Sequence, residues 1–326
     1  MEIKEIKSLL VKNKNKIYNS NILCIGDMIL DHYIYGYVER SSPEAPIPIL
    51  VFEKEVYELG GVGNVVRNIT SLGSKATLLN LSGFDKSSKK INQLISKNKN
   101  IKKLIFKIPE FTTPIKTRYI NNSAHMVRVD KENTNFKLSV SVKNSILDTL
   151  RKKISKFDLV ILSDYNKGLL DNDLIKKIIK ISNDNNKIII ADPKKNDLSV
   201  YSNANIITPN QKEITDSVNK KYLSEKNLIL LGKKIVKNNK INHLLITRSE
   251  KGMLLINDKF IKKYSAFTNK VYDVTGAGDT VIAALSVMIS IGLDIKTSVL
   301  ISNFIASIVI GKKGTAVMNY SDLKNN

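Results

Sequence analysis

A glycine-rich turn near the end of the chain combines residue types that can bind and transfer a phosphoryl group. Residues 271–284 read Val-Tyr-Asp-Val-Thr-Gly-Ala-Gly-Asp-Thr-Val-Ile-Ala-Ala. We expect a strand-like segment to end at Asp273 and an apolar helix to begin near Asp279, so that the unpaired N–H groups of its first turn point at an anion. The Asp279 carboxylate could then accept the proton of an attacking hydroxyl group, although an aspartate that only caps the helix would have the same spacing.

The elements that must position this turn form an alternating pattern of strands and helices. Short apolar runs without polar alternation indicate strands that are buried on both faces, and the segments between them have helical spacing. The predicted strands are residues 22–25, 78–81, 159–162, 188–191, 206–207 and 244–247, and the predicted helices are residues 1–18, 91–100, 173–182, 226–238 and two within 280–310. The pattern predicts an α/β protein whose parallel sheet is covered by helices on both faces.

Polar residues follow the predicted strands, and the carboxyl ends of parallel strands meet at one edge of a sheet. A carboxylate at Asp31 can accept hydrogen bonds from neighbouring sugar hydroxyls, although this residue is equally consistent with a loop or capping aspartate. The other candidates at strand ends are Asp164, Lys167, Asn210, Glu213, Thr247, Arg248 and Gly252. Glu213 also has the position of an acid that stabilises the first turn of a helix. We expect these strand ends to build one site.

Two segments interrupt the α/β alternation, at residues 33–58 and 112–129. The first contains three prolines, at positions 43, 46 and 48, and both segments are rich in aromatic and β-branched residues. Such segments are typical of extended strands outside the main sheet. We therefore predict a small β lid over the carboxyl edge of the sheet, which could close and exclude water.

A second glycine-rich turn, with Gly60, Gly61 and Gly63, opens a predicted helix in which Val65, Ile69 and Leu72 share a face. Its spacing does not match the Gly-x-Gly-x-x-Gly fingerprint of dinucleotide-binding proteins, and the turn after the first strand, Gly26-Asp27, does not supply that fingerprint either. The sequence therefore argues against a nicotinamide-dependent oxidoreductase.

The Asp-Val-Thr-Gly-Ala-Gly-Asp stretch at residues 273–279 resembles the C-terminal motif of the ribokinase-type (PfkB) carbohydrate kinases, and the similarity extends over nearly the whole chain. The resemblance implies a single ribokinase-like domain over residues 1–326, with a three-layer α/β/α fold, a mostly parallel central sheet and a small β lid. It also implies that Asp279 is the catalytic base, and that the backbone amides of Gly276, Ala277 and Gly278 hold the transferred phosphoryl group.

The same resemblance implies roles for the remaining candidates. The sugar would bind to Asp31, Gly60, Gly61, Asn64, Asp164 and Lys167. ATP would bind to Asn210, Glu213, Thr247, Arg248, Gly252 and Gly278, and Glu213 would hold Mg²⁺ through water. Arg118, Arg128, Lys167 and Lys194 remain alternatives for binding a phosphate group of the sugar.

Several segments resemble one branch of the family more closely, the kinases that phosphorylate the anomeric hydroxyl of D-glycero-β-D-manno-heptose 7-phosphate. They are residues 26–31, 42–46, 162–168, 191–194, 208–210 and 311–315. The resemblance implies ATP- and Mg²⁺-dependent formation of heptose 1,7-bisphosphate in ADP-heptose and lipopolysaccharide core biosynthesis. Kinases of fructose phosphates or ribose, and a non-catalytic binding protein, are the alternatives. The chain lacks the His-x-x-His motif of the nucleotidyltransferase often fused to such kinases, so we expect no nucleotidyltransferase domain.

The composition limits the other classes of protein. The formal net charge is +22 over 326 residues, but the lysines are distributed along the chain, so we expect a sugar phosphate and ATP as ligands and no nucleic acid. Cys24 lies in an apolar run, which indicates a buried structural thiol. The N-terminus lacks an apolar signal segment and residues 280–310 are divided into short pieces, so we expect a cytoplasmic protein that does not bind membranes. Unpaired edges of the lid strands predict a homodimer through the lid.

Overall fold

The computed structural model describes residues 2–122, 124–133, 135–267, 271–312 and 314–325. Its larger sheet has nine strands in the order β13-β12-β11-β10-β9-β8-β1-β4-β5, and all pairings from β11 to β5 are parallel. The strands are β1 (Asn21–Gly26), β4 (Lys75–Ser82), β5 (Ile101–Lys107), β8 (Leu159–Ser163), β9 (Ile188–Asp192), β10 (Ile206–Ile207), β11 (His243–Thr247), β12 (Met253–Ile256) and β13 (Ile261–Tyr264). The predicted mostly parallel sheet is confirmed.

The buried strands send alternate side chains into two separate hydrophobic cores, one on each face of the sheet. In β1, Ile22 and Cys24 enter one core, whereas Leu23 and Ile25 enter the other. The first core is covered by α1 (Ile3–Lys12), α2 (Lys14–Asn19), α3 (Val62–Ser71), α4 (Lys86–Ser96), α9 (Ala277–Ser290), α10 (Ile295–Ile310) and α11 (Asp322–Asn325). The second is covered by α5 (Val140–Lys153), η1 (Ile154–Lys156), α6 (Asn172–Asp184), η2 (Leu198–Tyr201), α7 (Gln211–Asp216) and α8 (Glu225–Asn238). This arrangement is the predicted three-layer α/β/α fold.

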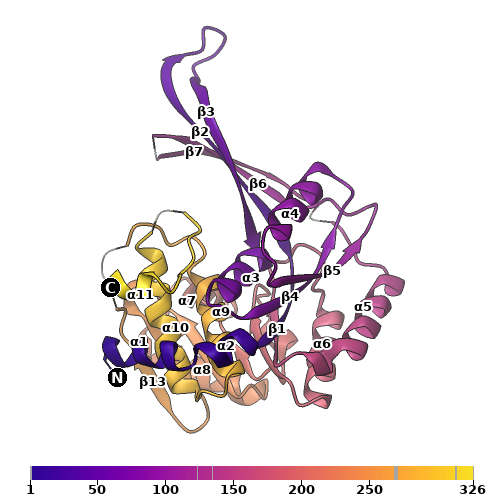
Figure 1. The fold of residues 1–326 in the computed structure, drawn as a ribbon, viewed down its shortest axis with the longest axis vertical. Coiled ribbons are helices and arrows are strands. Elements are labelled where there is room, and N and C mark those ends of the chain that lie inside the picture. The colour runs from indigo at the N-terminus through magenta and orange to yellow at the C-terminus, as the bar shows by residue number, and fades with distance from the viewer. Residues whose placement is uncertain (1, 123, 134, 268–270, 313, 326) are drawn as a thin grey trace.

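A second sheet of four strands, in the order β3-β2-β6-β7, forms the predicted lid. Its strands are β2 (Met28–Ser41), β3 (Pro48–Gly61), β6 (Ile115–Asn121) and β7 (Ala124–Lys131). The long β2–β3 hairpin rises away from the body of the molecule, with β6 and β7 beside its lower half (Figure 1). Because β2 follows β1 after a single residue and β3 leads directly into α3, the base of the lid is continuous with the main sheet.

Several predicted boundaries are wrong. In place of the single helix predicted over residues 1–18, the structure has two helices, Ile3–Lys12 and Lys14–Asn19, which are separated at Asn13. The helix expected at residues 91–100 lies at Lys86–Ser96, because the Asp85 carboxylate caps it by accepting from the N–H of Ser88 at 2.8 Å. The segment before the glycine turn is not a strand, since the N–H groups of Tyr272 and Asp273 both donate to the Ile310 carbonyl at the end of α10.

The sequence analysis missed β5, β12 and β13. β5 is a lysine-rich edge strand, and β12 and β13 extend the sheet with antiparallel pairing. Within the described residues, every helix is too short or too polar to cross a lipid bilayer. Cys24 is fully buried, as predicted, and burial raises the pKa of its thiol.

Candidate active site

Asp279 lies in the first turn of α9 and is only 6% exposed. Its Oδ2 atom accepts a hydrogen bond from Asn64 Nδ2 at 2.8 Å, and its Oδ1 atom accepts one from the Tyr165 hydroxyl at 2.7 Å. Asn64 belongs to α3 and Tyr165 follows β8, so three separate elements converge on this carboxylate.

Burial raises the pKa of Asp279 to about 6, and the negative charge of Asp31 acts in the same direction. The hydrogen bonds from Tyr165 and Asn64 and the positive charge of Lys194 oppose this increase. A carboxyl group with a pKa in this range is ionised at neutral pH yet is a stronger base than an exposed aspartate, which suits it to accept a proton.

The glycine turn leaves open space next to the Asp279 carboxylate. Gly276 is the N-cap of α9 and has a left-handed backbone with φ of 77°, and a Cβ atom there would lie 2.4 Å from Asn64 Nδ2. Gly278 differs, because no atom of the described residues lies within 4 Å of the position that its Cβ would occupy. The Ala277 N–H donates to the Val274 carbonyl at 3.1 Å, so one of the three amides predicted to hold an anion is already engaged. The Gly278 N–H lies on the open side of the turn, in space that an anion can enter.

A cavity of about 210 Å³ lies in front of this turn. Its lining brings together side chains and backbone from several strand ends of the main sheet. They are Asp164, Tyr165, Asp192, Lys194, Thr208, Asn210, Glu213, Thr247, Val274, Gly276, Ala277, Gly278 and Asp279. The predicted convergence of Asp164, Asn210, Glu213 and Thr247 with the glycine turn is therefore present in the structure.

Two larger cavities adjoin this one through shared residues. One, of about 590 Å³, is mostly apolar, and Phe267, Val281 and Ile310 contribute to its walls together with Gly252 and Gly278. The other, of about 490 Å³, is polar and runs from Asn210 to Lys251. An apolar cavity beside a turn with an exposed backbone N–H group has the chemistry that a nucleotide base and its phosphates require.

Arg248 lies on the wall between the two larger cavities and is 7% exposed. Its guanidinium donates to Glu225 at 2.8 Å and to the Lys251 carbonyl at 3.1 Å. Its buried Nε atom has no hydrogen-bond partner within the described part of the chain. The guanidinium group is therefore held next to both cavities by Glu225 and the Lys251 carbonyl.

Asn210 and Glu213 form a capping box at the start of α7. Glu213 N–H donates to Asn210 Oδ1 at 2.8 Å, and Asn210 N–H donates to Glu213 Oε2 at 2.9 Å. The other oxygen of Glu213 accepts from Lys194 Nζ at 2.8 Å. Glu213 therefore caps the helix and lines the cavity at the same time, so both interpretations of its position are compatible.

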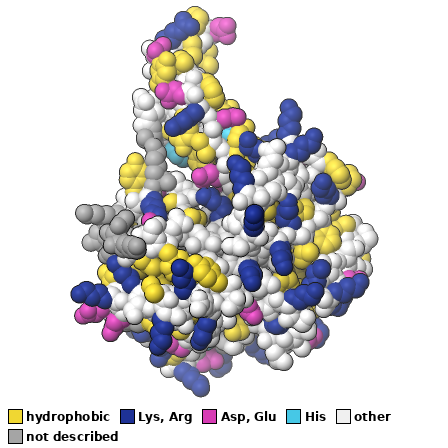
Figure 2. Space-filling view, viewed as in Figure 1, with side chains coloured by type: hydrophobic (Ala, Val, Ile, Leu, Met, Phe, Trp, Pro, Cys, Tyr) yellow, Lys and Arg dark blue, Asp and Glu magenta, His cyan; other side chains and the backbone are white. Residues whose placement is uncertain are grey.

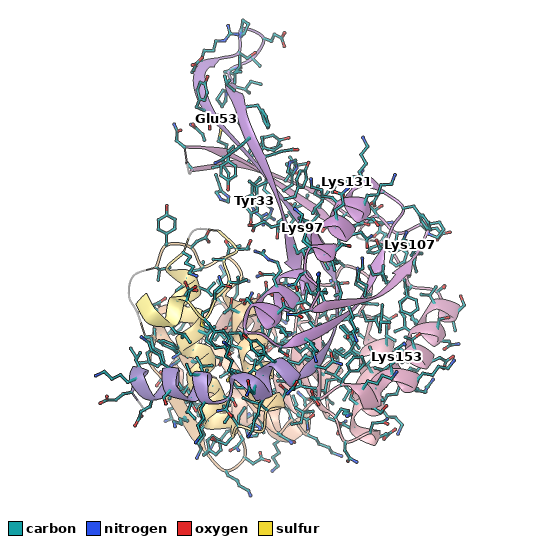
Figure 3. The ribbon with its side chains drawn as sticks, viewed as in Figure 1. Tyr33, Glu53, Lys97, Lys107, Lys131 and Lys153 are labelled. Atoms are coloured by element: carbon teal, nitrogen blue, oxygen red, sulfur yellow. The ribbon has the colours of Figure 1, made fainter. Side chains whose placement is uncertain are left out.

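At the base of the lid, Asp31 is 6% exposed and forms an ion pair with Arg118, with 2.6 Å between Oδ1 and Nη1. Arg118 also packs over the Tyr33 ring at 5.1 Å, and Figure 3 shows Tyr33 near the base of the lid and Glu53 far out on it. Gly60 allows the close approach of β3, because a Cβ atom there would lie 2.0 Å from Asp31 Oδ2. Gly61 ends β3 and is the N-cap of α3.

Asp164 is almost fully buried, and its carboxylate accepts from the Tyr201 hydroxyl at 2.6 Å and from the Asn166 N–H at 2.7 Å. Burial raises the pKa of Asp164 to about 6. Lys167 is the predicted residue that the structure separates from the others. It pairs with Glu132 at 2.7 Å and lines a different cavity, next to α5 and α6.

The sequence analysis did not assign roles to Tyr165, Asp192 or Asp27. Tyr165 follows Asp164 directly in the sequence. The contact of its hydroxyl with Asp279 depends on the folded structure, so the sequence carried no signal for it. Asp192 is the last residue of β9 and lines the cavity. Desolvation raises its pKa well above the usual value, and the charges of Glu213 and Asp279 act in the same direction. Its position at a strand end was the available signal.

The carboxylates of Asp192 and Glu213 fit a magnesium ion that enters with a nucleotide. Both line the cavity in front of the glycine turn and repel each other. Among the described residues, no three metal-binding side chains form a complete site. Mg²⁺ commonly uses one or two carboxylates plus waters and substrate phosphates, so this donor set is sufficient for it.

Comparison with known proteins agrees with this geometry. Residues 19–321 match the family model described as pfkB family carbohydrate kinase. The chain is 34% identical over 311 residues to the bifunctional protein HldE of Paramagnetospirillum magneticum, covering 95% of this chain and 64% of that protein. It is 38% identical over 303 residues to the bifunctional protein HldE of Helicobacter pylori strain J99, covering 93% and 65%. The chain thus spans about two thirds or less of the length of these relatives.

Solved structures show the same fold at low sequence identity. The tetrameric inhibited form of phosphofructokinase-2 from Escherichia coli has a TM-score of 0.78 at 17% identity, covering 94% of this chain and 97% of that one. Ribokinase from Arabidopsis thaliana, complexed with ribose and ATP, has a TM-score of 0.72 at 16% identity, covering 94% and 98%. The predicted ribokinase-like fold is confirmed. The chain belongs to the pfkB family of carbohydrate kinases, and it is therefore a phosphotransferase that acts on a sugar.

Proposed function

We propose that this kinase transfers the γ-phosphoryl group of ATP to the anomeric hydroxyl of D-glycero-β-D-manno-heptose 7-phosphate. The arrangement of Asp279 in front of the glycine turn is the observation that carries the reaction type. The heptose substrate is supported by the motifs at residues 26–31, 42–46 and 162–168 and by the identity of 34–38% to proteins named HldE. The product would be the 1,7-bisphosphate, for use in ADP-heptose and lipopolysaccharide core biosynthesis.

In this mechanism the sugar hydroxyl donates its proton to Asp279 as its oxygen attacks phosphorus. The N–H groups of Gly276 and Gly278 stabilise the charge on the transferred group, which enters on the open side of Gly278. The Ala277 N–H, which donates to the Val274 carbonyl, would contribute only after that hydrogen bond breaks. Asp31 and Asn64 hold the sugar, together with Gly60, Gly61 and Asp164. Every contribution is positional or electrostatic, so the proposal includes no covalent enzyme intermediate.

The nucleotide would occupy the two larger cavities. Its base would lie in the apolar cavity beside Gly252, and its phosphates would extend along Thr247 and Arg248 towards Asn210. Glu213 would hold the magnesium ion through water. When bound, Mg²⁺ neutralises phosphate charge and thereby favours attack by an electron-rich oxygen.

For a phosphate group on the sugar, Arg118 is favoured among the four cations considered. Arg118 lies beside Asp31 at the base of the lid. Lys194 is paired with Glu213 on the nucleotide side, and Lys167 lines a separate cavity. Arg128 lies on the outer lid strand and pairs with Asp130.

We also propose a homodimer through the lid. Val127 and Val129 on β7 are 54% and 52% exposed and share one face of the lid sheet, opposite Arg128. Figure 2 shows further hydrophobic side chains along the projecting lid, whereas Lys and Arg are scattered over this face of the body. A second copy would cover the apolar face. Light scattering tests this, because Val127→Lys should be a monomer at concentrations where wild type is a dimer.

We place the enzyme in the cytoplasm, where ATP is available.

The test is ATP consumption with Mg²⁺ and each of five sugars: heptose 7-phosphate, fructose 6-phosphate, fructose 1-phosphate, ribose and fructose. We expect the highest kcat/KM with heptose 7-phosphate and a phosphate on the anomeric carbon of the product in phosphorus NMR. Asp279→Asn should lower kcat by about 10²- to 10⁴-fold, because an amide cannot accept the proton. A higher kcat/KM with another sugar would reassign the substrate, and near-normal turnover by Asp279→Asn would remove this residue from the mechanism.

A further inference from the structure

The two oxygens of the Asp279 carboxylate are held by two different donors. Tyr165 donates its hydroxyl to Oδ1 at 2.7 Å, and Asn64 donates its amide to Oδ2 at 2.8 Å. The Asn64 side chain is in turn held by Asn68, whose Nδ2 atom donates to Asn64 Oδ1 at 3.3 Å and to the Asn64 main-chain carbonyl at 3.0 Å. The plane of the carboxylate is therefore fixed from two sides before any sugar arrives.

The backbone that carries Tyr165 is itself fixed by a buried aspartate. Asp27, between β1 and β2, is 3% exposed. Its Oδ2 atom accepts from the N–H groups of Tyr165 and Lys167, both at 3.0 Å, and its Oδ1 atom accepts from the N–H of Leu169 at 3.1 Å. Three hydrogen bonds to one carboxylate hold this loop in a single shape, so the Tyr165 hydroxyl is preorganised against Asp279.

Tyr165 remains a neutral donor over the working range of pH. Burial raises its pKa well above the usual value, and the charges of Asp279, Asp192 and Asp31 act in the same direction. A neutral phenol can only donate to an ionised Asp279, and this contact favours the carboxylate over the carboxylic acid.

The other groups around Asp279 act through space. The negative charge of Asp31, at the base of the lid, disfavours its ionisation, whereas the positive charge of Lys194 favours it. Asp192, at the end of β9, interacts electrostatically with Asp279. The Tyr165 and Asn64 side chains are the direct donors that the structure shows on this carboxylate within the described residues. Since Asn64 also faces the proposed sugar position, the Tyr165 hydroxyl is the contact that can be removed with least change to the sugar site.

We propose that Tyr165 is a positioning residue, whose hydroxyl orients the Asp279 carboxylate and keeps it in its proton-accepting form. This inference rests on the proposed function, because it assigns the role of Tyr165 through the base. Tyr165 lies outside the glycine turn and would be a further residue needed for catalysis. Asp27 would support it by holding the loop that carries Tyr165.

The test compares the pH dependence of kcat/KM for wild type, Tyr165→Phe and the control Tyr264→Phe. Tyr264 is also a buried tyrosine whose hydroxyl donates to a protein oxygen, the Lys296 carbonyl at 3.1 Å, but it lies outside the cavity in front of Asp279. In Tyr165→Phe the acidic limb should move to higher pH. The rate should fall roughly tenfold or more at pH 6.5 and recover most of that loss by pH 8.5, as expected when one hydrogen bond to a charged group is lost. Tyr264→Phe should follow wild type.

A second measurement does not depend on turnover. Carboxyl ¹³C NMR of aspartate-labelled protein, with Asp279→Asn to assign the signal, follows the ionisation of Asp279 directly. Its midpoint should be higher in Tyr165→Phe than in wild type. Equal midpoints, or a rate that falls by the same factor at every pH, would overturn the inference. If wild type phosphorylates none of the sugars, the proposed function fails, and the NMR midpoints still decide the role of Tyr165.

Discussion

At the scale of single residues, the structure resolves positions for which the sequence allowed two interpretations. Asp279 lies in the first helical turn, where it would also suit a capping role, but its carboxylate is held by side chains of other elements and faces a cavity. Glu213 is both a helix cap and a cavity residue. Capping and catalysis are therefore compatible at these positions, because a carboxylate has two oxygens and several lone pairs.

The two roles of Glu213 can be separated by Glu213→Gln. Glutamine keeps the capping box, since its side-chain oxygen still accepts from the Asn210 N–H, but it removes the charge next to the proposed magnesium site. We expect an unchanged Tm and a roughly tenfold higher KM for Mg·ATP. Glu5→Gln is the matched control, because Glu5 occupies the same position in the capping box of α1. An unchanged KM would limit Glu213 to a structural role.

At the scale of elements, the site depends on the contact between α3 and α9. Asn64 of α3 reaches Asp279 of α9, and Asn68 of α3 accepts from the Thr280 hydroxyl at 3.1 Å. These helices begin at the two glycine-rich turns, which lie more than 200 residues apart in the sequence. Their packing brings the two glycine-rich turns to one place.

Gly278→Ala tests whether the open side of this turn serves an anion. Alanine is a better helix former than glycine, and no atom of the described residues would contact its Cβ, so the Tm should stay the same or rise slightly. The methyl group would instead occupy the space in front of the proposed phosphoryl site, and kcat/KM should fall by about tenfold or more. A variant with raised stability and undiminished activity would argue against an anion site at Gly278.

At the scale of the whole molecule, buried carboxylates concentrate at the carboxyl edge of the sheet, and their burial disfavours ionisation. Burial raises the pKa of both Asp164 and Asp279 to about 6. Because the unfolded chain ionises these groups near pH 4, the folded state binds more protons than the unfolded state between about pH 4 and 6. Their contribution to stability is therefore lost as the pH rises through that window, by up to about 3 kcal/mol for each group.

We expect the Tm of the unliganded protein to peak at about pH 4 and to decline by several degrees towards pH 7. At lower pH, Asp273 and Asp294, whose pKa values are lowered by hydrogen bonds, lose their stabilising interactions. Between pH 5 and 7, His243 makes a contribution to stability that increases with pH, because burial lowers its pKa and the folded state therefore favours the neutral imidazole. Asp279→Asn should flatten the decline in calorimetric scans. A Tm that rises steadily to pH 8 in both proteins would contradict this account.

The sequence by itself determined the class of fold and most of the candidate residues. Continuous apolar strands such as Leu159–Ser163 can be satisfied only in a sheet covered on both faces, so local composition already specifies the layers. The glycine turns were recognisable because their backbone conformation and close contacts exclude other residues. Edge strands were less predictable, since β5 is rich in lysine and carries little apolar signal.

Only the tertiary structure decided which side chains meet. Tyr165, Asn64 and Asp279 come from segments about 100 residues apart or more. No local sequence pattern shows that the Tyr165 hydroxyl and the Asn64 amide each lie within 3 Å of the Asp279 carboxylate. The structure also separated Lys167 from the other predicted residues by turning it towards Glu132. Secondary structure follows from short-range periodicity and backbone preferences, whereas the pairing of side chains depends on how the layers pack, and that packing is fixed by the two cores as a whole.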